Sequence, residues 1–340
     1  MLLIMGISRT LQARVTGQCL NCHTMHASQG GSIAWYGGST GPFPALTRGN
    51  CYGCHTYDTT SAVASFGGSK IPQVLHSDYT NNLAAGNFNY IKDASGSADH
   101  KGHNVAAVNQ EGDASKFPPP GDEHSNSSIN AENFTCAGAN GCHGDREVTD
   151  QMASMKGAHH EKDSTIDGSG VGKSYRFLNG VKGVENNDAT YPWENRSATL
   201  HNEYKGMTGT GSSDVSKTSP GSHNTISGLC AECHGNYHYS DDIGGTSSPW
   251  LRHPTDVTLP TNGEYASYNT YSVLAPVARV TPASPSQTVT PGGNDNDIVM
   301  CLSCHGAHAT NYYKMMRWDY KAPDVTTAYS GCNICHTKKD

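Results

Sequence analysis

Every cysteine of the chain belongs to a pair that ends in histidine. The 340 residues contain 12 Cys and 18 His. Five pairs read C-x-x-C-H, and one has five residues between its cysteines. The six sites are Cys19, Cys22 and His23; Cys51, Cys54 and His55; Cys136, Cys142 and His143; Cys230, Cys233 and His234; Cys301, Cys304 and His305; and Cys332, Cys335 and His336. Six chance matches have a probability on the order of 10⁻⁸, so the pattern predicts c-type haem attachment rather than zinc sites or disulfides.

The spacing suits this chemistry. Two intervening residues place both sulfurs on one short helical turn, where they reach the two vinyl groups of a porphyrin, and the next residue brings an imidazole to the iron. In the third site the five intervening residues, 137–141, are small or turn-forming, and we expect them to bulge outward without moving the sulfurs. The sequence therefore predicts six covalently bound haems c, with the histidine of each site as proximal iron ligand.

Twelve histidines remain for the other face of each iron, twice as many as six-coordinate haems need. His26 and His308 each follow a proximal histidine by three residues, so they share its helical face at roughly 5–6 Å between Cβ atoms. If they ligate iron they must serve a different haem, and the alternative is a surface histidine next to a haem. Bis-His ligation is the economical interpretation, and methionine is the alternative ligand. The histidines without a specific assignment are His100, His124, His201 and His223.

The composition agrees with a core made of haem. Only 35% of the residues are hydrophobic and 8% aromatic, too few for two ordinary cores in a chain of this length. We predict a multihaem c-type cytochrome that is mostly coil, with short helices and little β structure, wrapped around a continuous chain of stacked haems. Short helices are expected within 148–159 and 311–318. The whole of 1–340 forms one unit, in which 1–18 is an N-terminal segment that is a remnant or a misassigned start.

Charge and hydropathy restrict the partners. The net charge of −7 argues against nucleic acid, and no run of 18 apolar residues predicts a membrane span. Haem is attached to C-x-x-C-H outside the cytoplasm, so we predict an exported, extracellular or cell-surface protein, although no signal peptide is evident at the start of the sequence.

Five segments resemble the hexahaem outer-surface cytochromes of metal-reducing bacteria, which polymerise into extracellular nanowires. These segments are 19–26, 101–104, 251–254, 301–308 and 332–336, and 174–178 is similar to the middle of those proteins. Haem count and motif order match along nearly the whole chain. The third site departs from the family, which has a two-residue spacing there followed closely by another histidine.

The resemblance implies bis-His ligation at all six haems, stacked in alternating parallel and T-shaped pairs. It implies that His26 ligates the haem of Cys301 and Cys304 in the next subunit of a head-to-tail homopolymer. The distal histidines that match are His26, His76, His103, His238, His253 and His308. His159 or His160 is an alternate that would replace the ligand missing at the third site.

Three functions are consistent with this set of residues. The leading one is electron transfer along an extracellular filament, without enzymatic catalysis, to external acceptors such as metal oxides and to other multihaem cytochromes. The second is a non-polymeric electron shuttle of the periplasm or cell surface. The third is a reductase of the nitrite or hydroxylamine type, which would keep one iron five-coordinate and which the surplus of histidine disfavours.

Overall fold

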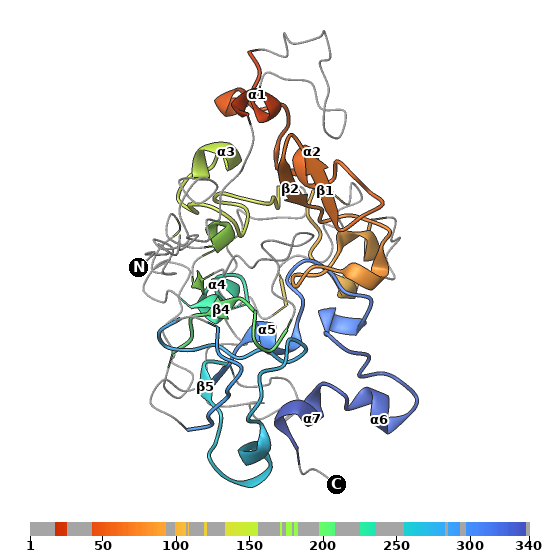
Figure 1. The fold of residues 1–340 in the computed structure, drawn as a ribbon, viewed down its shortest axis with the longest axis vertical. Coiled ribbons are helices and arrows are strands. Elements are labelled where there is room, and N and C mark those ends of the chain that lie inside the picture. The colour runs from red at the N-terminus through yellow and green to blue at the C-terminus, as the bar shows by residue number, and fades with distance from the viewer. Residues whose placement is uncertain are drawn as a thin grey trace, which may run out of the picture.

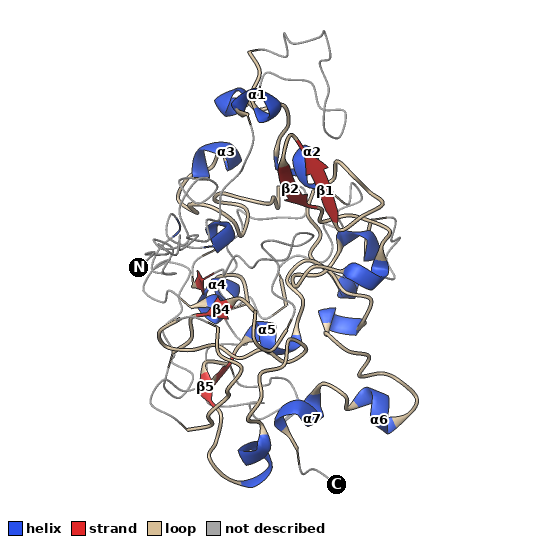
Figure 2. Ribbon diagram, viewed as in Figure 1, coloured by secondary structure: helices blue, strands red, loops and turns tan. Residues whose placement is uncertain are grey.

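A computed structural model of the chain describes residues 18–25, 43–92, 99–106, 108, 119–120, 133–155, 171, 175–178, 180–182, 197–207, 225–234, 255–282, 285–292 and 297–337. In these residues the chain is mostly loop (Figure 2). The predicted fold class, coil with short helices and little β structure, is confirmed.

The described helices are single turns. They are α1 (Cys19–Cys22), α2 (Cys51–His55), α3 (Gln151–Ser154), α4 (Ile226–Ala231), α5 (Cys301–Cys304), α6 (Val325–Ala328) and α7 (Cys332–Cys335). Four of them coincide with cysteine pairs, so the chain is helical at these motifs. None of these helices is long and apolar enough to cross a membrane.

The strands form three separate antiparallel ribbons. β1 (Val63–Phe66) pairs with β2 (Ser69–Pro72), β3 (Val181–Lys182) with β4 (Glu203–Tyr204), and β5 (Val257–Thr258) with β6 (Ile298–Val299). Two-stranded ribbons this short are not stable alone, so each depends on what packs against it.

Short 3₁₀ turns connect these pieces. They are η1 (Pro44–Leu46), η2 (Tyr79–Asn81), η3 (Phe88–Tyr90), η4 (Asp99–Lys101), η8 (Tyr175–Phe177), η10 (Gly263–Ser267) and η11 (Tyr313–Met315). The expected helix within 148–159 is present as α3. The expected helix within 311–318 is wrong: η11 turns the other way, with φ of 55° at Lys314 and 58° at Met315. In this turn the carbonyls of Lys314 and Met315 face His305 and the next residue, as described below.

The molecule is elongated, and its cysteine-bearing helices follow the long axis. Figure 1 shows α1 at one end, then α2, then α4 and α5 near the middle, and α7 at the other end. The order in space is therefore the order in the sequence.

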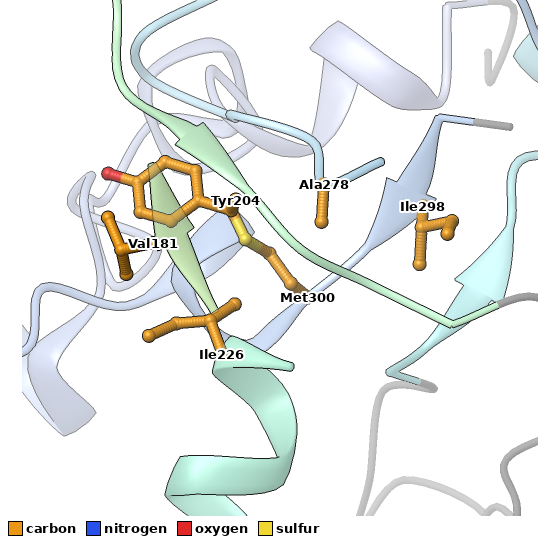
Figure 3. Close-up of a cluster of buried hydrophobic side chains, with 6 residues drawn as sticks. All are labelled: Val181, Tyr204, Ile226, Ala278, Ile298 and Met300. Atoms are coloured by element: carbon orange, nitrogen blue, oxygen red, sulfur yellow. The ribbon is translucent and has the colours of Figure 1, made fainter. Parts of the chain in front are cut away.

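Among the described residues, three small hydrophobic clusters take the place of a single core, and each packs beside cysteine sites. The first contains Val181, Tyr204, Ile226, Ala278, Ile298 and Met300, whose side chains gather between α4 and the ribbons in Figure 3. It packs against Leu229 and Leu302, beside the fourth and fifth sites. The second comprises Leu75, Phe88, Ile91, Val105, Val108 and Ala309, and it contacts Tyr52 and Cys136 of the second and third sites. The third comprises Leu259, Tyr268, Tyr271, Val277 and Val289, and it contacts Cys335 of the sixth.

A buried ion cluster lies between the first and third of these cores. Arg279 forms an ion pair with Glu203 through Nη1, and its Nε lies 3.1 Å from Oδ1 of Asp297. Nδ1 of His201 lies 3.6 Å from Oε1 of Glu203. The His201 ring stacks on the Tyr271 ring, with 3.5 Å between the ring centres. Burial raises the pKa of Glu203 to about 7, against the opposing effect of Arg279. The cluster thus holds a carboxyl group that titrates near neutrality.

Candidate haem sites

The five C-x-x-C-H segments share one backbone geometry. In α1, α5 and α7 the histidine N–H donates to the carbonyl of the first cysteine: His23 to Cys19 at 2.8 Å, His305 to Cys301 at 3.1 Å and His336 to Cys332 at 2.8 Å. The fourth site keeps this bond at 3.0 Å, although α4 ends before its second cysteine. Each turn is therefore closed by the residue that would bind iron.

The third site reproduces this closure despite its longer spacing. The N–H of His143 donates to the carbonyl of Cys136 at 3.0 Å, as in the shorter motifs. The five intervening residues form a loop that is closed by Gly138, whose N–H donates to the His143 carbonyl at 2.8 Å. Gly138 has φ +79°, and a Cβ there would lie 2.6 Å from the Val148 carbonyl oxygen. The insertion bulges away, as expected, and leaves the cysteine–histidine turn intact.

An oxygen atom lies beside Nδ1 of each of the six proximal imidazoles, and in five of them it accepts a hydrogen bond. Five face a backbone carbonyl at 2.7–2.8 Å, and His336 instead lies 3.0 Å from Oε1 of Glu264. The five carbonyls belong to Ala45 for His23, Pro72 for His55, Arg176 for His143, Pro120 for His234 and Lys314 for His305. An acceptor at Nδ1 favours the tautomer with its proton there, which leaves the Nε2 lone pair for a metal.

Three of these carbonyls sit in the same unusual turn. Ala45, Arg176 and Lys314 have φ of 57°, 57° and 55°, and the residue after each also has positive φ. The N–H of the residue after each histidine then donates to the carbonyl of that second turn residue, at 2.8–3.0 Å. A left-handed conformation costs about 1 kcal/mol or more per non-glycine residue, so these hydrogen bonds must offset it. Our sequence analysis missed the turns, since none contains glycine at the left-handed positions.

The thiols of neighbouring sites lie close together in chain order. Burial is the first reason that the pKa values of these thiols are raised, and a thiol of the adjacent site raises each further. The pairs are Cys22 with Cys54, Cys51 with Cys136, Cys142 with Cys233, and Cys304 with Cys335. A thiol–thiol hydrogen bond between Cys230 and Cys301 joins the fourth site to the fifth. Each internal site therefore directs one thiol toward the preceding site and one toward the following site.

Two histidines predicted as distal ligands approach proximal ones. The ring centres of His103 and His234 are 6.0 Å apart, and those of His308 and His143 are 6.2 Å apart. A metal–imidazole bond of about 2 Å, with roughly 1 Å from nitrogen to ring centre, separates two rings on one metal by about 6 Å. Both pairs have the separation that a shared iron requires.

The two distal segments hold each other in place. The N–H of His103 donates to the His308 carbonyl at 3.0 Å, and its Nδ1 lies 2.7 Å from the Ala307 carbonyl. A Cβ at Gly102 would lie 2.5 Å from the Cβ of Ala309, so glycine permits this close approach. Nδ1 of His308 is buried with no hydrogen-bond partner in the described part of the chain, and the ring stacks on Phe88 at 4.7 Å.

His76 is the third predicted distal histidine within the described residues. It is 0% exposed, and its backbone N–H and carbonyl both bond the Asn87 side chain, at 3.2 and 2.8 Å. Its buried Nε2 has no hydrogen-bond partner among the described residues. An unpaired buried nitrogen is costly unless something binds it, so the residue fits a haem ligand.

The remaining predicted ligands lie outside the described residues: His26, His238, His253, His159 and His160. His201 is described and differs from the ligands, because carbonyl oxygens of Asn202 and Ser286 lie 3.1 Å from its two nitrogens. The paired thiols, the Nδ1 acceptors and the orphaned His76 nitrogen fit covalent haem.

No family model matches the chain. A curated relative, the C-type cytochrome OmcS of Geobacter sulfurreducens, is 24% identical over 378 residues, which cover 93% of this chain and 82% of the relative. The chain resembles OmcS. Its fold agrees with the cryo-EM structure of OmcS nanowires from that organism, with a TM-score of 0.51 and 18% identity over 97% of this chain and all of the other. A second structure, the outer membrane cytochrome S filament, has a TM-score of 0.45 over the same share of both chains, at 18% identity. The predicted resemblance to an OmcS-like cytochrome is confirmed.

Proposed function

We propose that residues 1–340 form one hexahaem unit that transfers electrons over a long range and catalyses no other reaction. Six haems c would be held by the twelve cysteines as thioethers and by the six proximal histidines. Haem c supplies one-electron redox chemistry when bound. The observation that carries the proposal is that a thiol of each site lies near enough to a thiol of the next to affect it electrostatically, and hydrogen-bonds it between the fourth and fifth sites, because this supports one unbroken series of sites.

Bis-His ligation is part of this proposal. His103 would complete the iron of His234, and His308 the iron of His143, because of their ring separations. His308 thus takes the third site, for which the sequence suggested His159 or His160. His76 has the burial and the open nitrogen of a ligand. His26, His238 and His253 remain predictions, and closed irons throughout would leave no position for a substrate.

The two ends of the molecule support head-to-tail assembly. At the α1 end, Leu20, Met25 and Leu46 are 47%, 69% and 42% exposed; at the α6 end, Val325 and Tyr329 are 71% and 45% exposed. Apolar side chains at opposite ends suit a heterologous contact, which propagates into a filament unless it closes into a ring. The similar protein OmcS forms nanowires. The exposed Met25 precedes His26, which would ligate the haem of Cys301 and Cys304 in the next subunit.

The same reasoning gives the location and the partners. Covalent haem attachment, which takes place outside the cytoplasm, and the similarity to OmcS support a location at the cell surface or beyond it. Electrons from the protein would pass to other multihaem cytochromes and to external acceptors such as metal oxides.

Electron microscopy and intact mass of the purified protein test the proposal. We expect six haems per chain and filaments, and we expect His26→Ala to retain five or six haems but lose the filaments. His100→Ala is the matched control, since this ring packs on Tyr313 at 4.5 Å and no site uses it. Monodisperse wild-type particles would favour the non-polymeric shuttle, and fewer than six haems would refute the hexahaem unit.

A further inference from the structure

The sixth site differs from the other five in what faces its imidazole. His23, His55, His143, His234 and His305 each have a neutral backbone carbonyl beside Nδ1. At His336 the acceptor is a carboxylate oxygen of Glu264, 3.0 Å away. The oxygen is out of line with the ring N–H, so the contact is chiefly electrostatic.

Glu264 is held at this position from several directions. It lies in η10, and Thr337, the residue after His336, donates both its N–H, at 3.1 Å, and its hydroxyl to the Glu264 carbonyl. The Tyr265 hydroxyl bonds the Glu264 side chain, and the Tyr265 ring lies 5.0 Å from the His336 ring. The His336 and Glu264 side chains are only 22% and 25% exposed, which limits screening by water.

A negative charge beside a ligating imidazole makes the ligand more basic and stabilises the more positive state of the metal. We propose that Glu264 is a positioning and tuning residue that lowers the reduction potential of the haem at Cys332, Cys335 and His336. The inference rests on the proposed loading of six haems. It makes the end of the haem series distinct from the sites before it, where the acceptors carry no net charge.

Potentiometric titration of the purified hexahaem protein tests this assignment. In Glu264→Gln we expect one sixth of the haem absorbance to titrate at higher potential. The reduced-to-oxidised ratio of that fraction, at a fixed applied potential, should rise about tenfold, equivalent to ~59 mV for a one-electron couple. The electron paramagnetic resonance spectrum should change for one ferric haem in six.

The variant Glu264→Asp distinguishes the effect of contact with His336 from the effect of the negative charge. It keeps the negative charge but shortens the side chain, so contact with His336 is lost; we expect a shift in the same direction as for glutamine, though smaller. The intact mass of each variant is measured to count its haems. If Glu264→Gln does not load the sixth haem, the titration of Glu264→Asp tests the proposal. Six haems with unshifted titrations in both variants would overturn the tuning role alone. Fewer than six haems in the wild type would overturn the proposed function as well.

Discussion

Removal of the His103 imidazole tests the pairing of distal and proximal ligands. With 6.0 Å between the ring centres of His103 and His234, an iron midway would lie about 2 Å from each ring nitrogen. In His103→Ala the proximal ring stays, because its Nδ1 lies 2.7 Å from the Pro120 carbonyl, and one coordination position opens. We expect the reduced variant to bind carbon monoxide at one haem in six, where the wild type binds almost none.

The second pair provides an independent measurement. His308→Ala should open a different iron, that of His143, so the double variant should bind carbon monoxide at two haems in six. The control is His100→Ala, which removes an imidazole only three residues before His103 but leaves both ring pairs intact. Each variant needs an intact mass, so that lost haem is not mistaken for an open one. The reasoning would be refuted if fully loaded His103→Ala bound no more carbon monoxide than wild type, or no more than the His100→Ala control.

Three further results are expected. The double variant Cys136→Ala/Cys142→Ala should carry five haems by intact mass, and six would show that the longer motif is not an attachment site. Gly102→Ala places a Cβ 2.5 Å from that of Ala309, so magnetic circular dichroism should show partial loss of six-coordinate haem at two sites, with unchanged haem content. Burial raises the folded-state pKa of Glu203 to about 7, so the folded protein binds this proton more tightly than the unfolded chain does. Wild type should therefore lose up to about 3 kcal/mol relative to Glu203→Gln as pH rises from 4.5 to 7; a pH-independent difference in circular dichroism melts would contradict this.

The turn at each cysteine–histidine motif could be predicted from sequence because it is local. Two thiols and an imidazole within five residues define a turn by themselves, and even the longer third motif closes in the expected way. The three-residue offset of His308 from His305 also indicated that it must serve another iron. The iron that His308 would complete could not be predicted, because the approach of His308 to His143 depends on packing between segments far apart in the chain.

The oxygen atoms beside Nδ1 of the proximal histidines also could not be predicted from the sequence. Positive φ at Ala45, Arg176 and Lys314 opposes the ordinary preference of these residues, so local propensity predicts against the turns that form. Glu264 likewise carries no signal in its own neighbourhood, and only the folded chain brings it to His336. Tertiary contacts decide both features.

Main-chain oxygens lie beside Nδ1 of five imidazoles, and the three that belong to left-handed turns have a consequence for how such proteins diverge. A carbonyl is present whatever the side chain, so substitution at positions 45, 176 or 314 leaves the acceptor in place as long as the backbone keeps its turn. The orientation of these ligands is thus insulated from sequence drift, whereas at the sixth site one replacement of Glu264 removes the acceptor. In such chains the segments between the motifs can lose most of their sequence similarity while the backbone around each proposed haem site keeps its geometry. Backbone geometry is therefore a better guide than sequence to distant relatives.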